Sequence, residues 1–397
     1  MSLPEGWREM TLGEVCENIS RRFDFPSKKE VVFINTGDVL AGKFLHKDYI
    51  SKEGLPGQAK KAIKKGDILY SEIRPKNKRY AIVDFDVDDF VVSTKFMVLK
   101  KNDKIDLDFL YLFVTSEKIL KEFNQTAESR SGTFPQITFD AVKHILINLP
   151  PLQEQKAIAN MLSSFDEKIE LLKEQNETLE QMAQGVFREW FVDGVDESWE
   201  VCRLGDYVKT NIATLKKNDN LEMIQYLDTA SLTEGQISSY QLLNINDAPS
   251  RAKRKVEHLD ILISTVRPDQ KHYGIVRNPD DNIIVSTGYC VLNCHKINPY
   301  FVYLFLTSKQ MTEYLHNIAE GSTSTYPSLK PIDIENLEFN LPSSEKLESF
   351  FDIADSIWEK IDSNYEQIQT LQKIRDTLLP KLMSGEVRVG GDCYRTD

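Results

Sequence analysis

The sequence predicts an α+β protein with two tandem mixed α/β domains, separated by two long helices that form an antiparallel coiled coil. Three observations support this fold class. The second half of the 397-residue chain repeats the first, each copy is rich in β-branched and aromatic runs, and each copy is followed by a long heptad pattern. Because the helices are expected to pair antiparallel, the two domains should be related by a pseudo-two-fold axis.

The internal repeat has an offset of 192 or 193 residues. Matching segments follow in the same order in both copies: WREMTLGEV and WEVCRLGDY, GDILYSEIRP and LDILISTVRP, FVVSTKFMVLK and IIVSTGYCVLN, FLYLFVTSEK and FVYLFLTSKQ, and the Leu-Pro pairs at 149–150 and 341–342. A copy of about 190 residues exceeds the 20–50 residues of a solenoid repeat. Each copy is therefore expected to be a whole domain.

Within the first copy, β-branched and aromatic runs at 31–34, 67–73 and 90–99 predict strands. One helical segment is expected near 106–124, and its counterpart near 298–318. The predicted divisions are an N-terminal domain at 1–149, a central helix at 150–192, a C-terminal domain at 193–341, a second helix at 342–385 and a tail at 386–397.

The heptad patterns give the register of the helix pair. Each apolar seam contains a single polar member, Asn176 in the first helix and Asn364 in the second. A buried Asn is tolerated best opposite another Asn, and this pairing places Leu172 against Ile368 and Leu179 against Ile361. Pro380 is expected to interrupt the second helix. The alternative is that each helix packs only on its own domain, although the strict seven-residue repeat favours pairing.

Composition places the chain among globular proteins. Hydrophobic residues make up 41% and charged residues 28%, and no apolar run approaches the ~18 residues of a membrane helix. The start, MSLPEGW, lacks a basic stretch followed by an apolar one, so a cytoplasmic location is expected. The five scattered cysteines are expected to be free thiols.

The net charge of −12 is unevenly distributed. Residues 1–149 carry 24 basic and 22 acidic side chains, whereas 150–197 carry 4 and 11. The second copy repeats the contrast, with 14 and 17 in 198–341 and 7 and 11 in 342–397. Most of the net negative charge thus lies in the helical segments. The two domains are close to neutral, which is compatible with phosphate-binding faces on them.

Four sequence patterns resemble known catalytic or metal-binding motifs, and each lacks a residue that its motif requires. GDVLAGKF at 37–44 follows the phosphate-loop pattern until Phe44 replaces the required hydroxyl, so a turn between strands is expected instead. Asp67 and Glu72 lack the lysine of a nuclease site. Cys290 and the Cys294-His295 pair have no second cluster of zinc ligands, and NLPPL at 148–152 lacks the aromatic residue of an adenine-methylation motif.

Two basic loops occupy the same place in both copies, RPKNKRY at 74–80 and RPDQKHY at 267–273. The shared Arg-Pro frame suits phosphate contacts by Arg74 and Arg267, and the variable tip suits reading of base edges. The candidates for DNA contact are Arg74, Lys76, Asn77, Lys78, Arg79, Tyr80, Arg267, Gln270, Lys271, His272 and Tyr273, with Asp269 as a further base-reading candidate. The alternative is an ordinary solvated hairpin.

Two further groups of residues are candidates for DNA contact. Basic clusters at 60–65 and 251–255 contribute Lys60, Lys61, Lys64, Arg251, Lys253 and Arg254. A third paired loop, SRSGTFPQI and GSTSTYPSL, contributes Arg130, Thr133, Ser324 and Tyr326. Solvated faces and a simple turn are the alternatives for these groups.

Together these features resemble the DNA-specificity subunit of type I restriction-modification enzymes. The resemblance covers essentially the whole chain. It rests on the tandem architecture, the Arg-Pro loops and three segments, LPPLQEQKAIANML at 149–162, LEQMAQGVFREWF at 179–191 and LQKIRDTLLPKLMSGEV at 371–387.

This resemblance implies a non-catalytic subunit that holds no cofactor or metal of its own. Its two target-recognition domains would each read one half of a bipartite site in double-stranded DNA, and its helices would set the spacing and dock two methylation subunits. Those subunits would carry S-adenosylmethionine and methylate a flipped adenine, with ATP and magnesium likewise belonging to partners such as restriction subunits. The alternatives are a methyltransferase or nuclease in its own right, and a structural coiled-coil scaffold.

Overall fold

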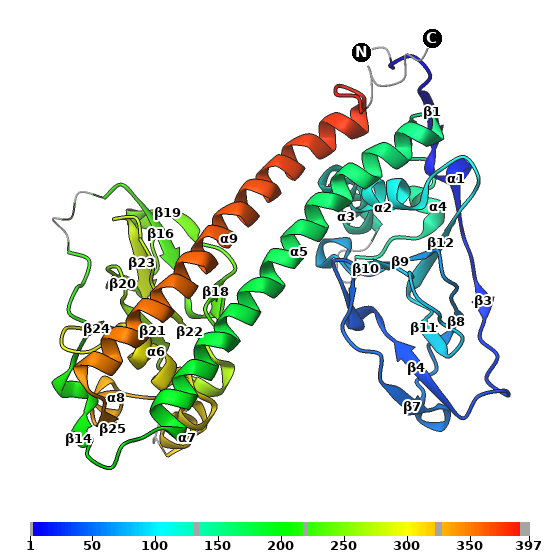
Figure 1. The fold of residues 1–397 in the computed structure, drawn as a ribbon. Coiled ribbons are helices and arrows are strands. Elements are labelled where there is room, and N and C mark those ends of the chain that lie inside the picture. The colour runs from blue at the N-terminus through cyan, green and yellow to red at the C-terminus, as the bar shows by residue number, and fades with distance from the viewer. Residues whose placement is uncertain (1–2, 131–134, 217–218, 220, 322–327, 390–397) are drawn as a thin grey trace, which may run out of the picture. The chain divides into compact units, whose positions relative to one another are not determined.

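The computed structural model describes residues 3–130, 135–216, 219, 221–321 and 328–389 (Figure 1). It divides into two compact units, and each unit is discontinuous in sequence. The first comprises Met1–Glu170 together with Ile368–Asp397, and the second comprises Leu171–Gln367. Each unit combines a mixed α/β domain with segments of both long helices, α5 (Leu152–Arg188) and α9 (Ser344–Ser384). The predicted tandem fold with two long helices packed together is confirmed.

The first unit contains two sheets, ordered β10-β9-β12-β2 and β3-β8-β11-β4-β7, and two smaller strand pairs, β1-β13 and β5-β6. Its elements are β1 (Arg8–Thr11), α1 (Leu12–Val15), β2 (Cys16–Asn18), β3 (Arg21–Arg22), β4 (Glu30–Ile34), η1 (Thr36–Asp38), β5 (Val39–Leu40), β6 (Lys43–Phe44), β7 (Tyr49–Ser51), η2 (Lys52–Gly54), β8 (Ala59–Ala62), β9 (Asp67–Ser71), η3 (Pro75–Asn77), β10 (Tyr80–Ile82), β11 (Phe90–Ser93), β12 (Phe96–Lys101), α2 (Leu107–Thr115), α3 (Glu117–Arg130), α4 (Phe139–Val142) and β13 (Leu146–Leu149).

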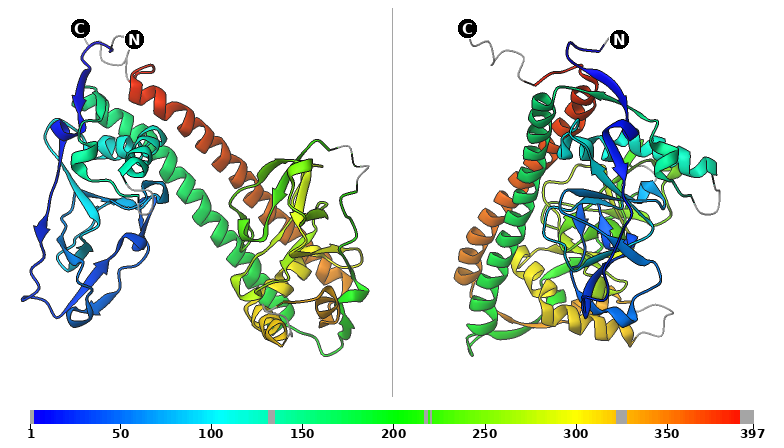
Figure 2. Two further views of the ribbon diagram at one scale, coloured as in Figure 1. Left: turned by 180° about the vertical axis from the view of Figure 1, so that it is seen from behind. Right: turned by 90° about the vertical axis from the view of Figure 1, so that its right-hand side faces the viewer.

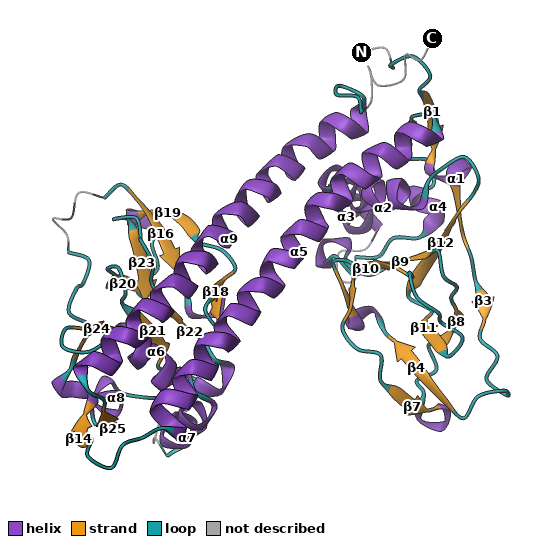
Figure 3. Cartoon of the chain, in the orientation of Figure 1, coloured by secondary structure: helices purple, strands orange, loops and turns teal. Residues whose placement is uncertain are grey.

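The second unit repeats this topology with sheets β15-β24-β21-β22 and β19-β16-β23-β20 and strand pairs β14-β25 and β17-β18 (Figure 3). Its elements are η4 (Glu189–Asp193), β14 (Glu200–Arg203), η5 (Leu204–Asp206), β15 (Val208–Thr210), β16 (Met223–Leu227), η6 (Thr229–Ser231), β17 (Leu232–Thr233), β18 (Gln236–Ile237), β19 (Gln241–Asn244), η7 (Ile245–Asp247), β20 (Ala252–Lys255), β21 (Ile261–Ser264), η8 (Pro268–Gln270), β22 (Tyr273–Ile275), β23 (Ile283–Ser286), β24 (Tyr289–Cys294), α6 (Pro299–Thr307), α7 (Lys309–Glu320), α8 (Pro331–Glu335) and β25 (Glu338–Leu341).

Both units share one parallel strand pair, β4 with β11 and β16 with β23, inside otherwise antiparallel sheets. The helical segment predicted in each copy consists of two helices, α2 and α3 in the first unit and α6 and α7 in the second. In both units one serine ends the first helix and begins the next. Ser116 and Ser308 have extended ψ values of 147° and 148°, and each Oγ accepts a hydrogen bond from the backbone N–H three residues later, at Ile119 and Met311. This is the geometry of an N-cap, which a hydrophobic pattern alone does not reveal.

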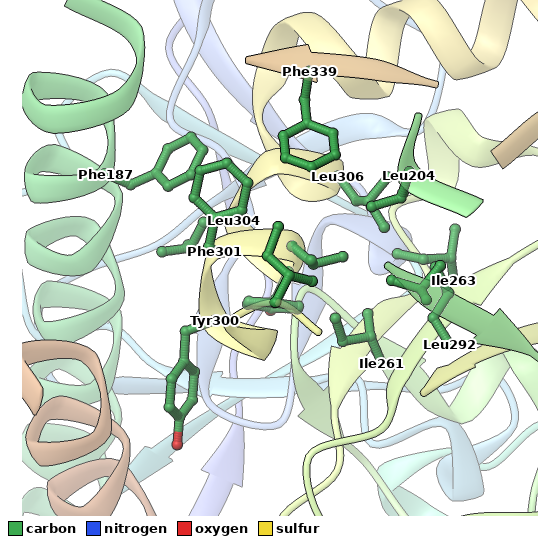
Figure 4. Close-up of a cluster of buried hydrophobic side chains, with 14 of the residues drawn as sticks. Phe187, Leu204, Ile261, Ile263, Leu292, Tyr300, Phe301, Leu304, Leu306 and Phe339 are labelled. Carbon is green, nitrogen blue, oxygen red and sulfur yellow. The ribbon is translucent and has the colours of Figure 1, made fainter. Parts of the chain in front are cut away.

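The core of each unit is closed by the long helices. In the second unit, Phe187 of α5 packs on Phe301 of α6, with ring centroids 5.5 Å apart (Figure 4). Phe350 of α9 is fully buried, with its ring centroid 6.2 Å from that of Phe187. In the first unit, Ile158 and Leu162 of α5 join the core. Truncating a buried Phe lowers the free energy of unfolding by about 3–5 kcal/mol. The long helices therefore belong to the core of each domain as well as to the helix pair.

Within the second unit, α5 and α9 lie side by side in both views of Figure 2 and pair antiparallel. Asn364 Nδ2 donates to Asn176 Oδ1 at 2.7 Å, and both side chains are buried. Further along, Trp190 contacts Phe350 with centroids 6.3 Å apart, so residue numbers rise on one helix as they fall on the other. These contacts have the register that the heptad pattern predicted.

The expectation that Pro380 interrupts the second helix is wrong, because α9 continues through it to Ser384. A proline inside a helix costs about 3 kcal/mol, and packing offsets that cost here. Leu382, two residues later, is 1% exposed in the core of the first unit. Among the described residues, no helix combines the length and the apolar character that crossing a bilayer requires.

We expect the single substitution Asn364→Leu to destabilise the protein by about 1–3 kcal/mol, because it leaves the buried amide of Asn176 unpaired. The double substitution Asn176→Leu/Asn364→Leu should recover most of that loss, since neither helix then buries a lone amide. Urea unfolding followed by tryptophan fluorescence measures both. Asn160→Leu, at an exposed position of α5, is the control. A double variant as unstable as the sum of its singles would contradict the paired role.

Candidate nucleic-acid interface

The two Arg-Pro loops adopt the same backbone conformation. Arg74 and Arg267 have φ/ψ values of 44°/73° and 49°/69°, and Lys78 and Lys271 have 52°/40° and 56°/37°. Left-handed conformations of non-glycine residues cost about 1–3 kcal/mol each and persist only when the surroundings impose them. The two copies therefore share the strained backbone of the loop together with its Arg, Pro and Lys residues, and differ at the positions between them.

Hydrogen bonds fix this frame from both sides. Ser71 Oγ accepts from the Ile73 N–H at 3.0 Å, and Ser264 Oγ accepts from the Val266 N–H at 3.2 Å. A neighbouring hairpin turn donates to the far end of each loop, from Ala41 N–H to the Lys78 carbonyl at 2.7 Å and from Glu234 N–H to the Lys271 carbonyl at 2.9 Å. The loops are therefore preorganised before any ligand binds.

Side chains at the tips of the loops are exposed. In the first loop these are Arg74, Lys76, Asn77 and Lys78, and in the second they are Arg267, Asp269, Gln270 and Lys271. The loops differ in charge because Asp269 replaces Lys76, and because Lys271 forms an ion pair with Glu234 at 2.6 Å. The position of Glu234 is occupied by Ala41 in the first unit, so Lys78 meets no such carboxylate there.

The two tyrosines of the loops are core residues. Tyr80 is 7% exposed and stacks on Tyr70 with ring centroids 5.5 Å apart. Tyr273 packs edge-on against Tyr303 at 6.2 Å, and burial raises its pKa to about 12. Both rings support the loops from inside, which leaves Tyr80 little surface for DNA contact, whereas DNA contact by the partly buried Tyr273 stays a prediction.

Arg79 and His272 also face the protein. The Arg79 guanidinium donates to the carbonyls of Gly37 and Val39 at 2.9 and 3.0 Å. His272 Nδ1 lies 2.7 Å from the Leu232 carbonyl oxygen, in the equivalent hairpin. Both side chains tie the loop to its neighbouring turn, so the structure gives them a supporting role, and DNA contact by these half-buried residues stays a prediction.

The basic clusters beside the loops divide into exposed and structural members. Lys60, Lys64, Arg251 and Lys253 are exposed. Lys61 Nζ instead donates to the Phe96 carbonyl at 2.6 Å, and burial lowers its pKa.

Arg254 is the counterpart of Lys61 in the second unit. It is half-buried, and burial lowers its pKa. The expectation of DNA contact therefore stands for the exposed members of the two clusters, but not for Lys61 and Arg254. Of the third paired loop, Thr133, Ser324, Tyr326 and the Arg130 side chain lie outside the described residues.

Two residues that the sequence analysis missed support the loops. Asn124 of α3 accepts the Lys76 N–H at 2.8 Å through Oδ1, and Glu234 pairs with Lys271. Neither lies in a conspicuous motif. Glu234 could have been found from the repeat, because it stands where the first copy has Ala41 in the phosphate-loop-like segment.

The acidic and thiol groups weighed as catalytic candidates have structural partners or are buried. Asp67 accepts from Arg21 Nη1 at 2.5 Å and from the Lys64 N–H at 2.7 Å. Burial raises the pKa of Cys290 and of Cys294 to about 12, which keeps both as thiols. The described part of the chain contains no group of three or more His, Cys, Asp or Glu side chains placed to hold a metal ion.

Comparison with known proteins identifies the family. The model of the type I restriction modification DNA specificity domain matches twice, at residues 4–181 and 196–378. The chain belongs to the type I restriction-modification specificity subunits. The two matches follow the internal repeat, so each unit of this specificity subunit contributes one specificity domain.

Relatives match this specificity subunit over most of its length. The type I restriction enzyme HindI specificity subunit of Haemophilus influenzae is 36% identical and aligns with 96% of this chain and 99% of its own. The MjaIX specificity subunit of Methanocaldococcus jannaschii is 29% identical over 74% and 71%. A crystal structure of the type I S subunit from M. genitalium has the same fold, with a TM-score of 0.54, 18% identity and coverage of 96% and 98%.

Arg79 and Lys76 make a matched pair for separating support from contact. We expect Arg79→Ala to destabilise the first unit by about 1–3 kcal/mol, because it removes two hydrogen bonds to the Gly37 and Val39 carbonyls. Lys76→Ala, at an exposed tip, should change stability by less than about 0.5 kcal/mol. Urea unfolding measures both. Equal stability losses would show that Arg79 is not a support for the loop.

Proposed function

We propose that this specificity subunit binds double-stranded DNA and that each of its two domains reads one half of a bipartite site. Arg74 and Arg267 contact phosphates, while Lys76 and Asn77 in one loop and Asp269 and Gln270 in the other read base edges. The observation that carries this proposal is the duplicated, hydrogen-bonded loop with a constant frame and a variable exposed tip. Phosphate contacts position a protein on DNA, and base contacts specify the sequence.

Catalysis resides in partner subunits of the complex. We propose that two methylation subunits, which bind S-adenosylmethionine, dock on α5 and α9, and that restriction subunits using ATP and magnesium join this core. The helical segments are acidic, with 4 basic and 11 acidic side chains in residues 150–197. Such a surface repels phosphate, which suits a spacer and a protein-docking surface better than a DNA-binding face.

The alternative functions differ in what the chain does alone. A methyltransferase or nuclease turns over DNA when supplied with S-adenosylmethionine or magnesium and no other protein. A structural scaffold keeps its DNA affinity unchanged when the two Arg-Pro loops are neutralised. Fixed loop geometry with exposed polar tips in both units favours specific DNA binding over either alternative.

We expect Asn77→Asp and Gln270→Glu each to change one half of the methylated motif and to leave the other half unchanged. An amide can both donate to and accept from a base edge, whereas a carboxylate only accepts, so the preferred base changes. Sequencing of methylated positions in cells that contain the complete methyltransferase reads out both half-sites.

Arg74→Ala and Arg267→Ala are the matched controls for this experiment. Loss of a phosphate contact weakens binding to all sequences and lowers the slope of log K against log salt by about one unit, without altering the motif. If the tip substitutions merely scale methylation of the original motif, the loops position the protein without reading sequence.

The proposal that the helices set the spacing between half-sites has its own test. Inserting one heptad after Leu172 and another after Gln367 keeps the predicted register and adds about 10 Å to the helix pair. We expect the preferred spacer to lengthen by about three base pairs, at ~3.4 Å each. Binding of oligonucleotides with graded spacers measures this. Unaltered preference in a well-folded variant would exclude the helices as a ruler.

A further inference from the structure

The second unit contains an acidic cavity of about 260 Å³ beside the Arg-Pro loop. One wall is formed by Glu177 and Glu180 of α5, and another by Glu234 of the β17–β18 turn. Tyr273, Tyr303 and Trp358 add aromatic rings from the loop, α6 and α9. Carboxylates with aromatic rings form a site that attracts cations and repels phosphate.

Two polar groups in this cavity lack partners. Tyr303 is 4% exposed and lines the cavity, and none of the hydrogen bonds between described residues uses its hydroxyl. The Glu180 carboxylate is half-buried and likewise unpaired within the described chain. Both groups point to one place, since the Tyr303 hydroxyl and Glu180 Oε1 each lie 3.3 Å from the position that a Cβ on Gly235 would take.

The first unit has a cation near the corresponding tyrosine pair. Tyr80 and Tyr111 are the repeat counterparts of Tyr273 and Tyr303, and their rings also meet edge-on, 5.9 Å apart. There the chain supplies its own cation. Arg375 Nη1 donates to Asp166 at 2.5 Å, and the Arg375 charge acts on the phenol of Tyr80 by lowering its pKa against the effect of burial.

In the second copy Ala183 stands at the repeat position of Arg375, so no arginine occupies this place on α5. Trp358 stands at the repeat position of Asp166, and the cavity is lined by glutamate and glutamine from α5. Lys271 is the cation that pairs with Glu234, and its side chain is half exposed. Glu180 and the Tyr303 hydroxyl remain available to a planar guanidinium, which can donate to a carboxylate and stack on an aromatic ring.

We propose that this cavity binds the guanidinium group of an arginine side chain presented by a methylation subunit. The site itself is argued from this chain alone, and only the choice of partner rests on the proposed function. The location supports that choice, because Glu177, Gln181 and Gln184 on the rim are exposed on α5. A bound guanidinium would also lie beside Glu234 and so contact the carboxylate that holds Lys271 of the recognition loop.

The first experiment tests the site in the full chain with N-acetyl-L-argininamide, followed by ligand-observed NMR. We expect saturable binding with a dissociation constant on the order of 1 mM, and no binding of the neutral isostere N-acetyl-citrullinamide. Glu180→Gln should weaken binding at least tenfold. Glu174→Gln makes the same charge change at an exposed position of α5 and should not. Equal binding of the two ligands, or none, overturns the site.

The effect of pH gives a second readout. Burial, with Glu234 and Glu177 nearby, raises the pKa of Glu180 to about 7. Affinity for argininamide should therefore fall as the pH drops below 7, and Glu180→Gln should flatten that profile. The other titratable groups facing Glu180 are Tyr273, Tyr303 and Tyr365, and Lys271 pairs with the neighbouring Glu234.

The same pKa shift predicts how stability depends on pH. The folded state holds the Glu180 proton more tightly than the unfolded state does, so its contribution to stability is lost as pH rises from about 4.5 to 7. Glu180→Gln should therefore raise the melting temperature at pH 8 relative to wild type, and have little effect at pH 5. This result also shows that the variant folds.

The second experiment identifies the source of the arginine. Glu180→Gln should weaken binding of the methylation subunit about tenfold and leave the DNA affinity of the isolated chain unchanged. Glu174→Gln should leave both affinities unchanged. Unaltered affinity for that subunit overturns the assignment of the partner. If wild type fails to bind the methylation subunit at all, the proposed function fails, and the argininamide titration still decides whether the site exists.

Discussion

Closure of each core by helix segments from distant parts of the sequence is the constraint on which the rest of the structure depends. The first unit needs residues 368–397 as well as 1–170. Leu382 is 1% exposed inside it, and Arg388 binds Glu154 through two hydrogen bonds of 3.0 and 2.8 Å. Glu154 in turn accepts from the Trp7 indole at 3.2 Å. The first domain is therefore complete only when the C-terminal end of the chain has folded onto it.

This closure explains why proline is tolerated at position 380. Helix propensity alone predicts a break in α9 at Pro380. The helix instead continues because Leu382 is buried and Leu378, Leu379 and Met383 pack around the same core. Full burial of Leu382, worth about 1.5–3 kcal/mol, together with partial burial of Leu378, Leu379 and Met383, offsets the local cost of one proline.

The features predicted correctly are those that follow a repeating pattern in the sequence. The internal repeat predicted the tandem fold, and the heptad patterns predicted the pairing of the long helices, including the contact between Asn176 and Asn364. The polar loops were located for the same reason, since they stand at equivalent places in both copies. The divisions of the chain at 149, 192, 341 and 385 and the DNA contacts themselves remain predictions.

The roles of individual loop residues could not be predicted, because they depend on tertiary neighbours. Tyr80 and Arg79 are adjacent in a basic, aromatic segment whose composition suits DNA binding. Tyr80 turns inward to Tyr70, and Arg79 reaches the carbonyls of a hairpin 40 residues earlier in the chain. Their partners lie outside any local window, so no pattern within 74–80 separates them from the exposed Lys76 and Asn77.

The two loops also show how duplication separates frame from specificity. Their backbones differ by at most 5° in the φ and ψ values of the two left-handed residues, yet Glu234 restrains Lys271 where Ala41 leaves Lys78 without that partner. A loop held by main-chain hydrogen bonds can change its side chains without losing its shape, because the bonds to Ala41 and Glu234 use only backbone atoms. One frame can thus carry two different polar tips. In the second unit the same turn also borders the acidic cavity, so Glu234 belongs both to the restraint on Lys271 and to the wall of that cavity.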